Sequence, residues 1–188
     1  MASSTPTPPA DPTPSADPAR PAVAATSAPI EHQQVLDTLT AQTAAIDELI
    51  GLARRTVRVF DQDLSETGWN GAARADRLAR FLRTNPGARL EIIVHDTMWI
   101  ERSAARLTNL LRRYAHAVTI YRTGPDAKGA MDPLVIVDGR HFLHRYHFEQ
   151  PRATLAIDAP HAANALVKRF EEIWATGEPG VTATVLGL

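Results

Sequence analysis

The apolar residues of this chain follow two spacings, one typical of amphipathic helices and one typical of buried strands. Steps of three and four residues run from Leu36 to Ala53 and predict a helix. The β-branched run Thr56–Phe60 follows it and predicts a strand, which Asp61-Gln62-Asp63 ends. The same alternation then repeats along the chain, which indicates an α/β fold.

Two further helices and two further strands are expected in the next 60 or so residues. Apolar residues at helical spacing fall within 75–82 and 100–114, and the strands are Leu90–Val94 and Val118–Tyr121. Asn85-Pro86-Gly87 ends the first of these helices, because proline cannot continue a helix and glycine permits the reversal. Since strand and helix alternate, we expect a mixed, largely parallel sheet flanked by helices on both faces.

A hairpin is expected after these elements. Leu134–Val137 is a continuous apolar run, as in a strand buried on both faces, and Asp138-Gly139 is a dipeptide that favours a tight turn. Phe142–Phe148 is the expected return strand. A strand at Ala153–Ile157 and a helix from Pro160 follow, and the alternating tail Val181–Leu188 is expected to form an edge strand or to pack across the fold.

The first 30 residues have a different composition. They consist mainly of Pro, Ala, Ser and Thr, which cannot bury enough apolar surface to offset the entropy of ordering. We therefore predict a disordered tail over residues 1–30 and one domain over residues 31–188. The tail lacks the basic and apolar regions of a secretory signal, and no stretch approaches the ~20 apolar residues of a membrane span, so we expect a cytoplasmic protein.

Charge and cysteine content narrow the classes of function. The formal net charge of -1 argues against binding of nucleic acid or acidic membranes through bulk charge, although it leaves room for a local basic patch. The chain has no cysteine, which excludes disulfides, thiolate metal sites and cysteine nucleophiles. We expect no cofactor and no bound metal.

The hairpin sequence resembles the signature of the phospholipase D-like superfamily, which reads His-x-Lys, four residues and Asp, usually followed by Gly. Asp138-Gly139 aligns with the end of that signature, which puts Met131 at the position of the His and Pro133 at that of the Lys. The closing Phe170-Glu-Glu-Ile-Trp174 also resembles the end of such a half domain. The family's Gly-Ser pair falls on Arg145 and Tyr146.

This resemblance implies that the reaction of the superfamily has been lost. In active members the His attacks a phosphodiester phosphorus and the Lys neutralises the phosphate oxygens. The thioether of Met131 cannot attack phosphorus and Pro133 carries no charge, so no catalytic residue is predicted. The leading hypothesis is a non-catalytic binding or regulatory module for a phosphate-bearing ligand or a protein partner.

A second, narrower resemblance concerns three segments and the end of the chain. They are similar to a bacterial domain family of unknown function that is often found behind a GNAT-type acetyltransferase domain. The resemblance implies that this chain carries that domain without the acetyltransferase. The segments are Phe60–Leu64, Arg106–Tyr114, Phe170–Trp174 and Leu186–Leu188.

Several carboxylates are expected at the carboxyl ends of strands, where open α/β sheets place their ligand crevices. They are Asp61, Asp63, Asp96 and Asp138. Each could simply cap the turn that follows it, or together they could bind Mg²⁺, which gives the alternative hypothesis of a phosphate-handling or metal-dependent hydrolase. The predicted ligand-binding groove comprises Asp61, Asp96, Asp138, Arg145 and His147.

Arginine is the expected phosphate ligand, because a guanidinium group binds phosphate through two parallel hydrogen bonds. The arginines fall into two groups, one on a predicted helix face and one near the hairpin. The alternative interpretation is that they form a solvated, arginine-rich surface. These residues are Arg102, Arg106, Arg112 and Arg113, and Arg122, Arg140, Arg145 and Arg152. Because phospholipase D-like halves pair across a pseudo-twofold axis, a self-associating homodimer is a third hypothesis.

Overall fold

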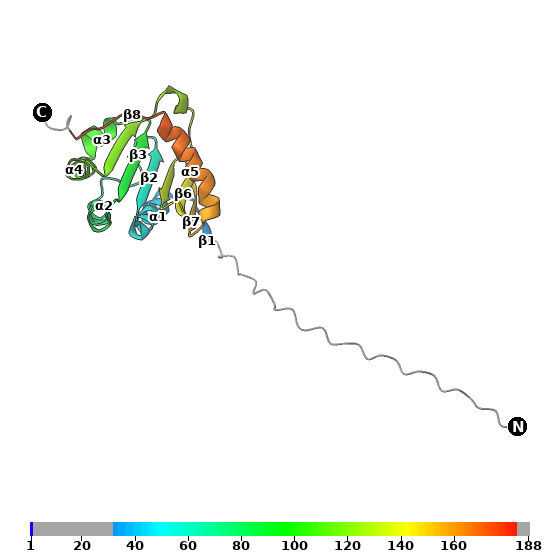
Figure 1. Cartoon of the computed structure of the whole chain (residues 1–188). Helices are drawn as coiled ribbons and strands as arrows, with labels where there is room; N and C mark the ends of the chain where they lie inside the picture. Colours follow the sequence, from blue (N-terminus) through cyan, green and yellow to red (C-terminus); the bar gives the residue numbers. More distant parts are fainter. Residues whose placement is uncertain (2–31, 184–188) are drawn as a thin grey trace.

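A computed structural model describes Met1 and residues 32–183 of the chain. Its centre is an eight-stranded sheet with the order β1-β7-β6-β5-β2-β3-β4-β8 (Figure 1). The strands are β1 (His32–Leu36), β2 (Thr56–Asp61), β3 (Arg89–Val94), β4 (Val118–Arg122), β5 (Leu134–Val137), β6 (His141–His147), β7 (Gln150–Ile157) and β8 (Glu178–Pro179). The helices are α1 (Leu39–Leu52), α2 (Ala72–Thr84), α3 (Met98–Ser103), α4 (Ala105–Arg113) and α5 (Pro160–Ala175), with a 3₁₀ turn at Pro125–Ala127.

The expected α/β class and mixed sheet are confirmed, but the parallel part of the sheet is small. Only the pairings β2 with β3 and β3 with β4 are parallel among the strands of residues 32–183. The other five pairings are antiparallel. The expectation of a largely parallel sheet therefore holds for β2–β4 alone, because β5, β6 and β7 follow one another through short turns, which can only join antiparallel neighbours.

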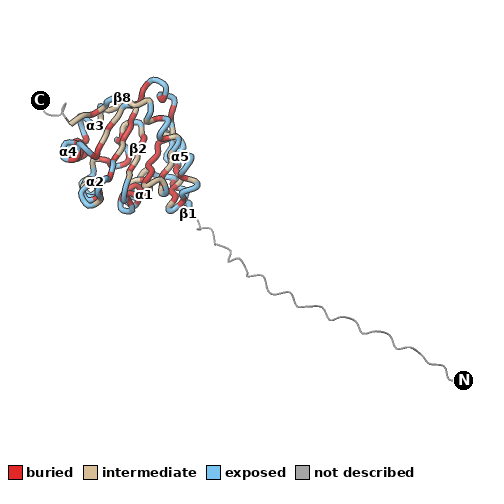
Figure 2. The backbone as a smooth tube through the Cα atoms, in the orientation of Figure 1, coloured by how far each residue is buried: buried red, intermediate tan, exposed pale blue. Residues whose placement is uncertain are grey.

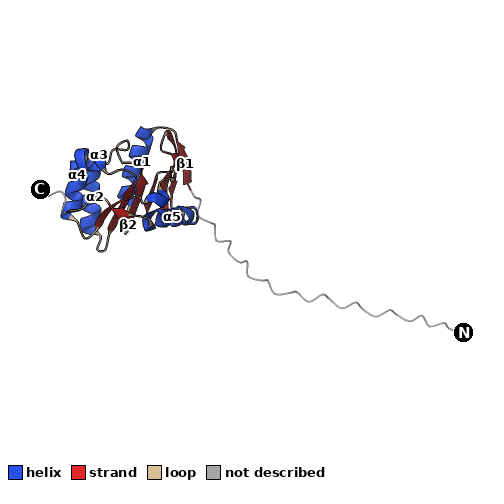
Figure 3. Cartoon of the chain, turned by 90° about the horizontal axis from the view of Figure 1, so that it is seen from above, coloured by secondary structure: helices blue, strands red, loops and turns tan. Residues whose placement is uncertain are grey.

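Helices cover both faces of the sheet. Helices α1, α2 and α4 pack on one face and α5 packs on the other (Figures 1 and 3). Alternate residues of β5 show the division, since Val135 and Val137 belong to the first core and Leu134 and Ile136 to the second. This double burial explains the continuous apolar run in the sequence, because neither face of the strand reaches water.

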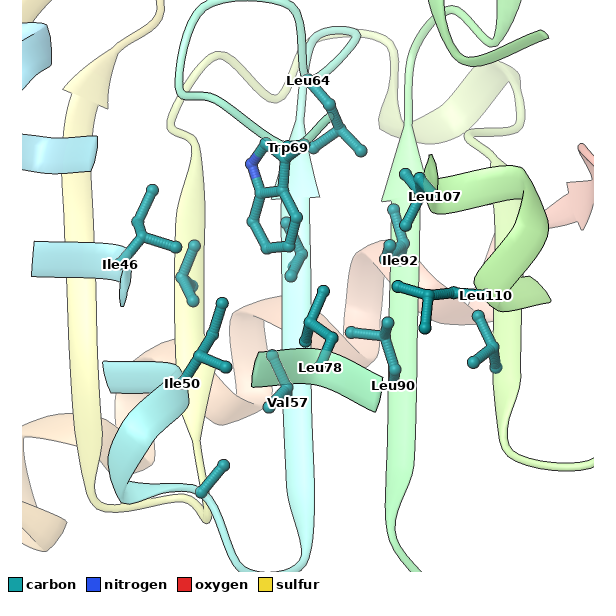
Figure 4. Close-up of a cluster of buried hydrophobic side chains, with 14 of the residues drawn as sticks. Ile46, Ile50, Val57, Leu64, Trp69, Leu78, Leu90, Ile92, Leu107 and Leu110 are labelled. Carbon is teal, nitrogen blue, oxygen red and sulfur yellow. The ribbon is translucent and has the colours of Figure 1, made fainter. Parts of the chain in front are cut away.

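The larger core lies between the sheet and the three helices of the first face. Side chains from α1, α2 and α4 meet the strand side chains Val57, Leu90 and Ile92, and Leu64 and Trp69 from the loop after β2 cover one end (Figure 4). All five of these residues are buried. Burial is concentrated along the strands, while the outer helix surfaces are exposed (Figure 2).

Two of the predicted helices have different limits from those expected. Leu36 ends β1 instead of opening the first helix, because Thr38 caps α1 by accepting a hydrogen bond from the Ala41 amide at 3.2 Å. The expected helix over 100–114 is two helices, α3 and α4, since Ala104 leaves helical geometry with φ -100° and ψ 53°. Sequence periodicity misses this break because Ala104 is a good helix former.

The turn between β5 and β6 is confirmed as a tight hairpin. Asp138 and Gly139 have φ values of 53° and 66°, the left-handed conformation that Asp and Gly tolerate and that hairpin turns require. A short edge strand, β8, lies at the C-terminal side, just before the tail Val181–Leu188 in which it was expected. Most of that tail, and the predicted tail over residues 1–30 apart from Met1, lie outside the described residues. None of the helices in the described part of the chain has the length and apolar character needed to cross a bilayer.

Candidate functional site

The predicted phospholipase D-like positions lie at one end of the sheet. Because β5 runs antiparallel to β2, the beginning of β5 lies beside the end of β2, and Phe60 pairs with Leu134. Pro133 precedes β5 and therefore lies beside Asp61, the last residue of β2, and Met131 comes two residues before Pro133. We call this region the crevice, and it contains a cavity lined by residues that include Asp61, Thr67, Pro133 and Arg145.

Arg145 is the cation of the crevice. Its amide donates to the carbonyl of Pro133 at 2.8 Å, so the two residues are directly opposite on neighbouring strands. The side chain is buried, with 4% of its surface exposed, and the guanidinium group donates to the carbonyl of Gln150 at 2.7 Å and to that of Phe148. Its remaining arm contacts the carboxylate of Glu66 at 2.6 Å. All three arms of the guanidinium group therefore have partners within the chain.

Asp61 lies beside Arg145 in the same cavity. Burial raises the pKa of its carboxyl group to about 7, against the opposing effects of the Gln62 amide, which donates to it at 2.7 Å, and of the positive charge of Arg145. The cavity has a total void of about 270 Å³, much of it open to solvent. The hydroxyl of Thr67 is buried in its wall and has no hydrogen-bond partner among the described residues. The enclosed part of this space is narrow and mostly apolar, with a few polar groups that include Asp61, Thr67 and Arg145, so it suits a bound water or a single polar atom of a ligand.

Two histidines lie at this end of the sheet. His95 bridges the hydroxyl of Thr123 and the carbonyl of Ala130, each at 2.7 Å. Since a carbonyl can only accept, the Nε2 atom of His95 donates to Ala130, and this ring is fixed in place. His147 is on β6, and its Nδ1 atom accepts from the amide of Glu149 at 3.1 Å. Among the five predicted groove residues, the structure brings Asp61, Asp96, Arg145 and His147 to the crevice end.

Asp63 and Asp96 organise local turns at the same end. Asp63 accepts from the amide of Ser65 at 2.9 Å and from its hydroxyl at 2.7 Å. Asp96 accepts from the amide of Met98 at 2.8 Å, at the start of α3. Within residues 32–183, no group of three or more His, Asp or Glu side chains is arranged so that it could hold a metal ion. The aspartates therefore have the capping role that the sequence offered as one alternative.

Asp138 does not share the crevice, which corrects the predicted groove. It follows β5, so it lies at the opposite end of the sheet from the start of that strand. Its carboxylate accepts from the backbone amides of Arg54 at 2.8 Å, Arg55 at 2.7 Å and Thr56 at 2.8 Å. The residue that alone matches the superfamily signature thus fixes the hairpin turn to the beginning of β2.

The arginines expected around the hairpin are also dispersed. Arg140 is next to Asp138 in the turn and pairs with Asp158, while Arg122 pairs with Glu178 at 2.9 Å at the β8 edge. Arg152 is 4.0 Å from Asp37. Arg145 is the one member of this group at the crevice, because it alone lies on β6 directly across from Pro133.

Sequence reasoning did not identify Glu66, Thr67 or Gln42 as residues of the site. Glu66 and Thr67 belong to the loop after β2, and Gln42 is a buried residue of α1 that donates to the carbonyl of Pro151 at 2.7 Å. A polar residue on the apolar stripe of α1 was the available signal for Gln42. No motif marks the other two, since their position depends on how the loop returns over the sheet.

The chain is similar to one family and to several solved structures. The profile of a family described as Domain of unknown function (DUF7931) matches residues 38–184. No curated protein matches the chain. The family match begins at Thr38, the cap of α1, and covers all the described elements except β1.

Three solved structures share the fold at low sequence identity. Nuc from Salmonella typhimurium, a phospholipase D family member, is 12% identical with a TM-score of 0.53, and covers 81% of this chain and 99% of its own. NucT from Helicobacter pylori is 13% identical with a TM-score of 0.53, and covers 80% and 99%. The archaeal chromatin protein TrmBL2 is 13% identical with a TM-score of 0.61, and the match covers 84% of this chain and 57% of TrmBL2. The fold is therefore phospholipase D-like.

Proposed function

Since the chain belongs to the DUF7931 family and has a phospholipase D-like fold, we propose that it is a non-catalytic domain that binds a phosphate-bearing ligand at the crevice. One observation carries this proposal: Arg145 places a buried guanidinium group directly across from Pro133. The alignment with the superfamily signature adds that Met131 stands at the position of the nucleophilic His. A cation without a nucleophile can bind phosphate without forming a covalent intermediate.

Glu66 is the internal competitor for such a ligand. Its carboxylate is an anion at 2.6 Å from the Arg145 guanidinium group, and its side chain is 49% exposed. An exposed carboxylate can move into water at little cost, so a phosphate group could replace it on the same arm of Arg145. Asp61 would repel the phosphate when ionised, which favours binding below the raised pKa of that group, about 7.

The absence of turnover can be tested directly. The wild-type chain should hydrolyse an activated diester such as bis-para-nitrophenyl phosphate no faster than buffer, because Met131 and Pro133 cannot do the work of the superfamily's His nucleophile and Lys. Asp61→Asn and, as a control for an exposed aspartate elsewhere, Asp76→Asn should give the same background. Turnover in the wild type that is lost in Asp61→Asn but kept in Asp76→Asn would show an enzyme and refute the proposal.

Binding is tested separately by isothermal titration calorimetry with inorganic phosphate as the ligand. Glu66→Gln removes the competing charge, and we expect it to tighten phosphate binding about tenfold, which corresponds to ~1.4 kcal/mol. Arg145→Gln should abolish binding, with its fold checked by circular dichroism. If neither the wild type nor Glu66→Gln binds phosphate, the crevice is not a phosphate site, and a protein partner becomes the better hypothesis.

Three broader predictions accompany this proposal. The neighbour TrmBL2 is described as having a novel mode of DNA binding, which makes a phosphate-bearing polymer a reasonable class of ligand to test. Self-association and a link to acetyltransferases stay predictions from the sequence. Light scattering at two protein concentrations tests the first of them.

A further inference from the structure

We propose that the end of the sheet opposite the crevice binds the phosphate backbone of double-stranded nucleic acid. This surface, which we call the basic end, is separate from the proposed phosphate site at Arg145 and lies at the beginnings of β2 and β3. It consists of five exposed arginines, namely Arg54, Arg55, Arg80, Arg83 and Arg89.

The fold gathers these arginines from three segments. Arg54 and Arg55 connect α1 to β2, Arg80 and Arg83 are in the last two turns of α2, and Arg89 opens β3. The amide of Arg89 donates to the carbonyl of Arg55 at 2.9 Å. Arg54 and Arg80 line one groove between the C-terminal ends of α1 and α2, with a total void of about 420 Å³. The five residues therefore form one surface.

Their charges are not neutralised by neighbouring carboxylates. Within residues 32–183, none of the five forms an ion pair. Asp47 faces Arg74 at 2.9 Å and Arg77 at 3.2 Å, on the crevice side of the groove. The Asp138 carboxylate accepts three backbone amides, two of them from Arg54 and Arg55, so one negative charge lies beneath this surface.

The negative ends of two helix dipoles offset only a part of the positive charge. The C-terminal ends of α1 and α2 lie here, and each carries an effective charge of about -0.5, or about -1 together. With Asp138 the local negative charge is about -2, against five guanidinium groups. The surface keeps an excess of roughly three positive charges, more than stabilisation of the helix ends requires.

The composition of the surface favours duplex nucleic acid. All five cations are arginines, whose planar fork matches a phosphate group better than an ammonium does. No exposed aromatic side chain of the described residues lies among them, which disfavours the base stacking that single strands use. One large apolar side chain, Leu52, is exposed nearby at 37%, too little to insert into a lipid surface.

The separation of charge explains how a chain of formal net charge -1 can bind a polyanion. Asp61, Asp63, Glu66 and Asp96 all lie at the crevice end, while the unpaired arginines lie at the other end. A duplex would approach the basic end first, because the local potential and not the net charge steers association at short range.

The test is fluorescence anisotropy of a short labelled DNA duplex with the full chain at about 50 and 200 mM salt. If about four phosphates are contacted, affinity should fall about 100-fold over this range. The double variant Arg80→Gln/Arg83→Gln should weaken binding at least tenfold at low salt and reduce the slope of log affinity against log salt by about two. The matched control, Arg102→Gln/Arg152→Gln, removes two charges elsewhere and should bind as the wild type does.

Three outcomes would overturn the proposal. They are no duplex binding at low salt, equal loss in both double variants, and tighter binding to anionic phospholipid vesicles than to the duplex through the same arginines. Failure at the basic end is distinct from failure at the crevice, because the crevice is followed with inorganic phosphate and Glu66→Gln. The variants replace exposed side chains, and thermal unfolding will verify that each retains the wild-type fold.

Discussion

Asp138 should stabilise the fold and take no part in catalysis, although it aligns with the Asp of the superfamily signature. Its carboxylate accepts from three consecutive amides at 2.7–2.8 Å, which joins the β5–β6 turn to the start of β2. Hydrogen bonds to a charged group contribute about 1.5–3 kcal/mol each when buried, and we take roughly 1 kcal/mol for each here because two of them are exposed. Their joint loss should cost about 3 kcal/mol.

Three substitutions separate this contribution from that of the backbone. Asp138 has a φ of 53°, so Asp138→Ala should lose the hydrogen bonds and add about 1 kcal/mol of left-handed strain. Asp138→Gly should lose the hydrogen bonds without adding strain. Asp138→Asn should keep some of the hydrogen bonds through its amide oxygen, and Asn tolerates the left-handed conformation. We therefore expect a fall in the free energy of unfolding of about 4 kcal/mol for Ala, about 3 for Gly and about 1–2 for Asn.

Urea unfolding followed by circular dichroism measures these differences, with the m-value checked for constancy. A loss of less than about 1 kcal/mol in Asp138→Ala, or a lower stability of Asp138→Gly than of Asp138→Ala, would contradict a stabilising role for these three hydrogen bonds. Inorganic phosphate binding at the crevice should be unchanged in the folded fraction of each variant. A specific loss of binding in stable Asp138→Asn would instead connect this residue to the ligand.

Three other predictions concern pH and backbone space. Burial raises the pKa of Asp61 to about 7, so the protonated carboxyl group stabilises the fold fully below pH 4, and this stabilisation is lost as the pH rises through 7. In Asp61→Asn the free energy of unfolding, measured with urea, should therefore fall less between pH 5 and pH 8 than in the wild type. Burial would raise the pKa of Asp132, but the His144 ring, 3.5 Å away, and a hydrogen bond from Arg169 hold it at about 2, so Asp132→Asn should cost about 1 kcal/mol or less at pH 7 and nothing once the pH is well below 2. In a thermal melt, Gly124→Ala should destabilise the chain, since a Cβ atom there would lie within hard contact of a neighbouring carbonyl oxygen, whereas Gly51→Ala in α1 meets no atom within 4 Å and should stabilise by up to about 1 kcal/mol.

The sequence predicted most of the elements because their apolar residues carry a strong period. The strands over 56–60, 90–94 and 118–121 and the buried strand at 134–137 all lie within one residue of their observed limits. Sequence could not reveal the break at Ala104, which depends on how α3 and α4 each pack. It also missed β1, because a short strand with its polar residues exposed has no period that separates it from the helix that follows.

The site was predicted less well than the fold for a topological reason. Asp61 ends β2 and Asp138 directly follows β5, but β5 runs antiparallel to β2, so the C-terminal ends of these two strands lie at opposite ends of the sheet. The Asp138-Gly139 dipeptide predicted a turn there, which already implied that the chain reverses direction after β5. Arg145 was identified through the family alignment, whereas its partner Glu66 depends on a loop whose path no local pattern records.

The pairing of β1 with β7 has a practical consequence for anyone who trims the chain. Positions from His32 to Leu36 pair with Ile157 to Ala153, so the first described strand protects the edge formed by one of the last. The family match begins at residue 38, after this strand ends. A fragment cut at that boundary would leave the β7 edge unpaired, and open edges recruit strands from other molecules. Apparent oligomers of such a fragment would reflect the missing strand and not the native assembly.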